Sequence, residues 1–158
     1  MRLAFAMLSE FAEATVDGKL TIISGDFDQV NGPAYPAIQP RISLVIRLEI
    51  GLDEVGREHT LRVELTGPMG EPIFVPIGSP FTPQLPPDVE LIDRTWVRYA
   101  FVFNFPGLYF PAAGKYLFHI STDDVELGTL PLYAVQVRQP DTTGVPTQQT
   151  SEREEGVS

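Results

Sequence analysis

The chain has 158 residues, which suits one domain with a sizeable core, and its 43% hydrophobic and 20% charged residues are typical of globular proteins. Its formal net charge of −10 argues against nucleic acid or an anionic membrane surface as a partner, because both attract clustered lysine and arginine. Cysteine is absent, which excludes disulfides, thiol nucleophiles and thiolate zinc sites.

The first segment, MRLAFAMLSEFAEA, can be interpreted as a signal peptide or as a β-strand. Arg2, an apolar run and Ala-Glu-Ala at 12–14 imitate a signal peptide. The apolar run over 3–8 is shorter than the roughly 7–15 residues usual there, and Ser9 and Glu10 interrupt it. We therefore expect a first β-strand and a cytoplasmic protein. No segment reaches the ~20 apolar residues of a membrane-spanning helix.

Apolar and polar side chains alternate along several segments, as they do in strands with one face in the core. Residues 41–50, RISLVIRLEI, place isoleucine or leucine at every even position. The segments TLRVELT, WVRYAFVFNF and KYLFHIS alternate in the same way. The pattern predicts strands over residues 2–12, 19–24, 41–50, 59–66, 72–77, 95–105, 115–122 and 129–137. We expect these side chains in the core: Leu44, Ile46, Val63, Tyr99, Phe101, Phe103, Tyr116 and Phe118.

Turn signals separate the predicted strands. Asp17-Gly18 favours a type I′ hairpin, and Pro106-Gly107 suits a type II turn with glycine in the left-handed position. About eight short strands with such punctuation indicate an all-β protein. We predict an antiparallel β-sandwich, immunoglobulin-like or C2-like.

Prolines dominate the segment GPMGEPIFVPIGSPFTPQLPPDVE, residues 67–90. Because proline cannot donate to a β-ladder, PIFVPI is predicted as an edge strand, where proline also discourages unwanted pairing. A Pro-x-x-Pro ligand, Pro80 to Pro83 or Pro83 to Pro86, is the alternative. We favour the structural interpretation.

The composition changes after Val137. The remainder, RQPDTTGVPTQQTSEREEGVS, has no aromatic residue and no apolar periodicity. We predict a β-sandwich domain over 1–138 and a flexible acidic tail over 139–158.

The sequence gives little sign of catalysis. In KYLFHIS, His119 is expected on the outward face, and His59 begins another strand with nothing to bring the two histidines together. There is no G-x-S-x-G, P-loop or G-x-G-x-x-G motif. We predict that the protein is not an enzyme and has no catalytic residues, metal site or cofactor.

Two stretches, LAFAMLSEFAEATVDGKLTIISGDFDQV near the start and FPAAGKYLFHISTDD near the end, resemble a bacterial family of short all-β proteins of unknown function. The resemblance covers about residues 1–137 and leaves out the tail. It rests partly on Gly-x-Tyr-x-Phe at 114–118, a motif that recurs in many sandwich folds. The family implies a sandwich fold and supplies no activity, cofactor or functional residue.

If successive strands reverse direction, the connections gather at two ends. One end collects residues 17–18, 51–58, 78–94 and 123–128, which are acidic. The other collects 25–40, 67–71 and 106–114, which are rich in proline, glycine and aromatic residues. The sequence therefore predicts an acidic end and an apolar end.

Two functions fit these ends. The first is a non-catalytic interaction or structural module that binds a protein partner, or itself, through the apolar end or an edge strand. Its expected contact residues are Tyr35, Leu108, Tyr109 and Phe110, because aromatic side chains on rigid loops are typical interface anchors. We expect Tyr35, Leu108 and Tyr109 to lie near one another and partly exposed; the alternative for these loop side chains is that they fold inward and cap the sandwich. The alternative is a calcium-dependent binding module that uses Asp53, Asp88, Asp123, Asp124 and Glu126.

Overall fold

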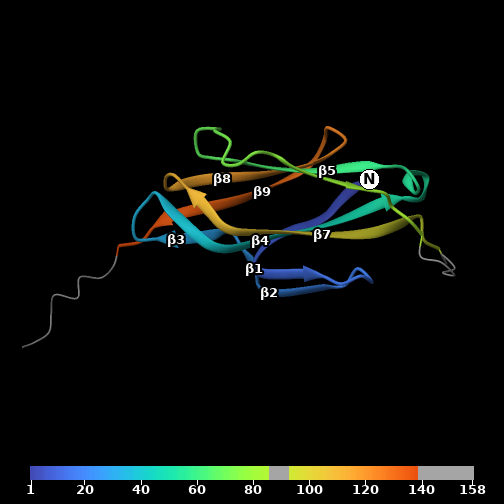
Figure 1. Cartoon of the computed structure of the whole chain (residues 1–158), viewed down its shortest axis with the longest axis horizontal. Helices are drawn as coiled ribbons and strands as arrows, with labels where there is room; N and C mark the ends of the chain where they lie inside the picture. Colours follow the sequence, from blue (N-terminus) through green and yellow to red (C-terminus); the bar gives the residue numbers. More distant parts are fainter. Residues whose placement is uncertain (86–92, 139–158) are drawn as a thin grey trace, which may run out of the picture.

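The computed structural model describes residues 1–85 and 93–138, and two β-sheets pack face to face in it (Figure 1). Sheet A has the strand order β2-β1-β4-β7, and sheet B has the order β3-β9-β8-β5-β6. The elements are β1 (Arg2–Ala14), β2 (Leu20–Phe27), β3 (Gln29–Gly32), β4 (Ala37–Gly51), the 3₁₀ turn η1 (Leu52–Glu54), β5 (His59–Thr66), β6 (Ile77–Phe81), β7 (Trp96–Phe110), β8 (Gly114–Thr122) and β9 (Val125–Gln136).

The predicted all-β sandwich is confirmed, but its strands are not all antiparallel. The four-residue strand β3 runs parallel to β9, with Val30 opposite Ala134, so sheet B is mixed. The alternation rule misses β3 because four residues are too few to show a period. Segment 1–14 does form a strand, paired with both β2 and β4.

The proline-rich segment supplies an edge strand at a different place from the predicted one. Residues 72–77 were expected to form it, whereas β6 spans Ile77–Phe81 and contains Pro80. Segment 72–76 makes only an isolated bridge between Thr66 and Pro72. Pro83 is buried, which does not suit a Pro-x-x-Pro ligand. Pro86, Asp88 and the predicted tail over 139–158 lie outside the described residues.

The core lies between the sheets and follows the predicted alternation. Even-numbered residues of β4 from Ile42 to Ile50 face sheet B and are fully buried. Five of the eight predicted core residues are buried: Leu44, Ile46, Val63, Tyr116 and Phe118. The other three, Tyr99, Phe101 and Phe103, pack against the core but are only partly buried. The reason is their position on β7, which is the last strand of sheet A.

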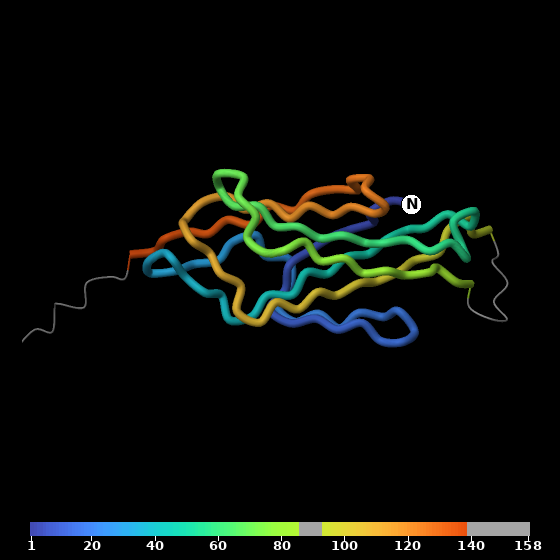
Figure 2. The backbone as a smooth tube through the Cα atoms, turned by 45° about the horizontal axis from the view of Figure 1, so that its top comes forward, coloured from blue at the N-terminus to red at the C-terminus, as the bar shows by residue number. Residues whose placement is uncertain are grey.

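A hairpin folds against the outer face of sheet A. The second half of β1 leaves β4 after Ser9, pairs with β2 and lies alongside the sheet (Figure 2). The Arg47 guanidinium donates a hydrogen bond of 3.2 Å to the Gly18 carbonyl at the hairpin tip. Val45 points away from sheet B and is nonetheless fully buried. Only Gly18, and not Asp17, has a positive φ at the tip, so the predicted hairpin is present without the predicted type I′ turn.

Several of the predicted connections gather at two ends. Backbone hydrogen bonds from Gly56 to Pro83, from Leu52 to Thr95 and from Asp123 to Thr60 join three acidic connections at one end. At the opposite end the connections 67–71 and 111–114 meet, because Pro68 lies against Gly114. In the two described stretches there is no helix long and apolar enough to cross a membrane.

Candidate functional site

The predicted contact residues do not form one exposed surface. Leu108 is 6% exposed and Phe110 is 1% exposed, so the expectation that they lie at the surface is wrong. β7 continues through Pro106-Gly107 to Phe110 instead of ending in a type II turn. Gly107 has a φ of +84°, and beyond it the even-numbered residues of β7 face the core in place of the odd-numbered ones. This change places Leu108 and Phe110 inside the sandwich.

The two tyrosines of the predicted set differ from each other. Tyr109 is 49% exposed and lies opposite Ile38, itself 65% exposed, on the outer face of sheet A. Tyr35 is half-buried and donates a hydrogen bond of 3.2 Å from its hydroxyl to the Val135 carbonyl. Burial raises the pKa of Tyr35. Tyr35 therefore ties the chain before β4 to β9, and Tyr109 alone of the four has a largely exposed side chain.

His59 belongs to a structural link at the acidic end. Its Nδ1 lies 2.6 Å from Asp123 Oδ2, while Asp123 Oδ1 accepts the Thr60 N–H at 2.9 Å. The hydrogen bond with His59, and then the one from Thr60, hold the pKa of Asp123 below its ordinary value. The other ring nitrogen of His59 faces the Glu54 carbonyl at 3.4 Å. Both nitrogens are thus engaged with a carboxylate and a carbonyl, an arrangement that holds β5 to the β8–β9 turn.

His119 points outward, as predicted. Its Nε2 lies 3.1 Å from the Thr66 hydroxyl, and its Nδ1 lies 3.4 Å from Glu126. Over residues 1–85 and 93–138, no three histidine or acidic side chains converge in a way that could hold a metal ion. The acidic connections of this part of the chain therefore give no geometric support to the calcium alternative.

Glu49 holds two arginines on the outer face of sheet A. Its side chain is 8% exposed and pairs with Arg2 and, at 3.1 Å, with Arg98. The hydrogen bond from Arg2 lowers the pKa of Glu49, against the opposing effect of burial. Arg98 also lies over the Trp96 ring, 4.9 Å from its centroid. These paired side chains join β1, β4 and β7 in one network of charge-assisted hydrogen bonds.

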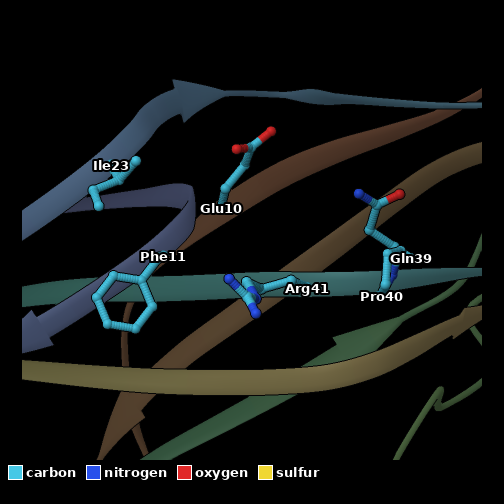
Figure 3. Close-up of a pocket in the computed structure, with 6 residues that line it drawn as sticks. All are labelled: Glu10, Phe11, Ile23, Gln39, Pro40 and Arg41. Carbon is cyan, nitrogen blue, oxygen red and sulfur yellow. The ribbon is translucent and has the colours of Figure 1, made fainter.

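A groove of about 660 Å³ opens where the hairpin diverges from β4. Figure 3 shows the side chains around it, with Phe11 and Ile23 on the hairpin and Arg41 on β4. β4 pairs with β1 only as far as Ser43, so the groove results from the departure of the hairpin from β4. Pro40 lies at this stretch of β4 and cannot donate a ladder hydrogen bond.

The edge of sheet A formed by β7 differs from the other sheet edges in length and regularity. Across residues 1–85 and 93–138, the sandwich has four edge strands: β2 and β7 in sheet A, β3 and β6 in sheet B. β3 has four residues, β6 has five with Pro80 among them, and β2 contains two left-handed residues, Ser24 and Asp26. β7 has 15 residues, with Arg98 as its one charge and Pro106 as its one proline. Within the described part of the chain, β4 is the only strand that pairs with it.

Aromatic side chains line this edge, which we call the β7 edge and define as residues 97–105. Tyr99, Phe101, Phe103 and Phe105 face the core yet remain partly buried. Rings from the segment that leads into and forms β6 pack against them: Phe81 lies 4.9 Å from Phe101, and Phe74 stacks on Phe105 at 5.3 Å, both between ring centroids. Sequence reasoning missed the edge because alternation does not tell which strand is outermost. The sole signal is the single charge in WVRYAFVFNF.

A family model matches residues 4–135 and carries the description "family of unknown function (DUF6941)". The chain belongs to the DUF6941 family. No curated protein and no solved structure matches the chain. The family is one of unknown function, as the resemblance in the sequence implies, and it assigns no activity.

Proposed function

We propose that this DUF6941 protein is a non-catalytic interaction module that adds a β-strand from another polypeptide chain to its β7 edge. The observation that carries the proposal is the contrast among the four edges. Three are short, irregular or interrupted by proline, which are the usual ways to prevent edge-to-edge pairing. The fourth is long and nearly uncharged, and such an edge is a template for another strand.

Two contributions would stabilise the added strand. Backbone groups of β7 that point away from β4 would complete a ladder, and each net hydrogen bond contributes about 0.5–1.5 kcal/mol. The partly buried rings Phe101, Phe103 and Phe105 would lose their remaining contact with water. Burial of that apolar area stabilises by roughly 25 cal/mol per Å² before the cost of association.

A synthetic peptide tests whether the edge accepts a strand. The probe is a fluorescein-labelled peptide of four Val-Thr repeats between serines, and its control carries proline in place of every valine. With the protein dilute enough for the edge to be free, we expect fluorescence anisotropy to show binding of the probe, but not of the proline peptide, to the wild-type protein. The peptide has no charged side chain, which avoids a purely electrostatic signal from a protein with a net charge of −10.

Ala100→Pro is the matched edge variant, with Ala100→Val as its control. Pro106 has no N–H and β7 accommodates it, so the backbone position of residue 106 should face away from β4. Backbone groups alternate in direction along a strand, so the N–H of Ala100, six residues earlier, should face the open edge too. Proline at position 100 should therefore remove one donor from that edge. We expect Ala100→Pro to abolish peptide binding while the single chain remains folded, and Ala100→Val to bind like the wild type. A second variant, Phe103→Lys, adds an inward-pointing charge that can reach water only at an open edge. We expect this charge to weaken peptide binding. The proposal is refuted if Ala100→Pro and Phe103→Lys bind the peptide as tightly as the wild type.

A further inference from the structure

We infer that the strand added to the β7 edge is β7 of a second copy of the chain, antiparallel, with a two-fold axis at Phe101. The inference rests on the proposed function and names its partner. A symmetric dimer of this kind would turn the four strands of sheet A into one continuous sheet of twice that number.

Geometry restricts the register. Directly opposed residues in an antiparallel pair share a face of the sheet, so under two-fold symmetry one residue must lie opposite its own copy. The regular alternation of β7 covers residues 97–105 and ends at Pro106-Gly107, where the inward positions change parity. Pairing over the whole of this regular stretch places its centre, Phe101, on the axis.

The inward pairs of this register are all apolar or aromatic. Val97 lies opposite Phe105, Tyr99 opposite Phe103, and Phe101 opposite its own copy. Cross-strand pairs of aromatic and β-branched residues are among the more stabilising ones in sheets, at roughly 0.2–1 kcal/mol each. All of these residues except Val97 are only partly buried in the single chain, and the dimer would cover them further.

The outward pairs contain no clash of charge. Ala100 lies opposite Val102, and Arg98, the one charged residue of β7, lies opposite Asn104. Pro80 discourages β6, the corresponding edge of sheet B, from pairing in turn. The contact is therefore confined to the edge of sheet A and the rings beside it.

The distribution of charge favours antiparallel over parallel pairing. β7 begins at the acidic end, where Trp96 lies opposite Gly51 beside η1. Reversing the second copy places its acidic end at the far end of the shared sheet. Two chains with a net charge of −10 each then associate with their most acidic loops far apart.

The absence of cysteine makes a direct test of the register possible. We would prepare Ala100→Cys and Val102→Cys separately, oxidise each alone and in an equimolar mixture, and compare the products on a non-reducing gel. Opposed residues have Cα atoms about 4.5–5.5 Å apart, within disulfide range, whereas diagonal neighbours lie at about 7–8 Å, beyond it. We expect a covalent dimer from the mixture and little from either variant alone. A mixture of Ala100→Cys and Asn104→Cys is the control that should not cross-link.

Sedimentation separates the two proposals from each other. We expect a species of twice the 17.5 kDa chain for the wild type and Ala100→Val, and a folded 17.5 kDa species for Ala100→Pro. A monomeric wild type without cross-links would overturn the second-copy inference. The proposed function would stand if the Val-Thr peptide still bound, and it would fall with the inference if the peptide did not. A dimer whose cysteine mixtures cross-link indiscriminately would overturn the register.

Discussion

Neighbouring residues of β7 differ in how much their side chains contribute to the stability of the fold. Leu108 is buried in the core and Tyr109 is half exposed beside Ile38, although both were expected at the surface. We predict that Leu108→Ala lowers the free energy of unfolding by about 2–5 kcal/mol, because it leaves a cavity. Tyr109→Ser should change it by less than about 0.5 kcal/mol. Urea denaturation of both variants measures the contrast, and equal losses would show that Tyr109 also packs inward.

The link between Asp123 and His59 makes stability depend on pH. Asp123 has a lowered pKa in the folded protein, so its carboxylate stabilises the fold above the ordinary value of 3.8. That contribution is lost as the pH falls through the folded pKa. We predict that Asp123→Asn is less stable than the wild type near neutral pH and that the difference shrinks once the pH falls below 3.8. Thermal unfolding across pH checks this, and a difference that persists in acid would assign the effect to shape alone.

At the scale of elements, the hairpin formed by β1 and β2 is anchored to β4 at its tip. The hydrogen bond from Arg47 to the Gly18 carbonyl fixes its tip. We predict that Arg47→Ala weakens this attachment by about 1 kcal/mol. Amide hydrogen exchange should accelerate over residues 15–19, with little change in the melting temperature of the sandwich. Arg41→Ala on the same strand is the control and should leave exchange unchanged, because the hydrogen bond to the hairpin tip comes from Arg47.

Strands with a fully buried face could be predicted from the sequence, whereas of the sheet edges only the proline-rich strand could, and at a shifted position. The alternation of RISLVIRLEI and KYLFHIS follows from the pleat, which places every second side chain in the core. Whether a strand lies outermost depends on pairing between distant segments, as for β3, which finds β9 about a hundred residues later. Leu108 and Phe110 were misplaced because Gly107 was interpreted as a turn, whereas it changes the facing of a continuous strand. The β7 edge was missed because the sequence does not show which strand lies outermost.

At the scale of the whole molecule, assembly should appear in the thermal stability. A dimer that forms only from folded chains is stabilised by mass action. We predict that the melting temperature of the wild type rises with protein concentration, while that of Ala100→Pro does not. Differential scanning calorimetry over about a hundredfold range of concentration measures both. A wild-type melting temperature that is independent of concentration would contradict self-association.

The direction of the strands also has a mechanical consequence. The start of β1 and the end of β9 lie at opposite ends of the long axis (Figures 1 and 2). A force applied between Arg2 and Gln136 would run along β1, which pairs with β4 from Arg2 to Ser9, and along β9, which pairs with β3 and β8. It would shear whole ladders at once instead of opening them one hydrogen bond at a time, so the sandwich is built to bear tension along its length.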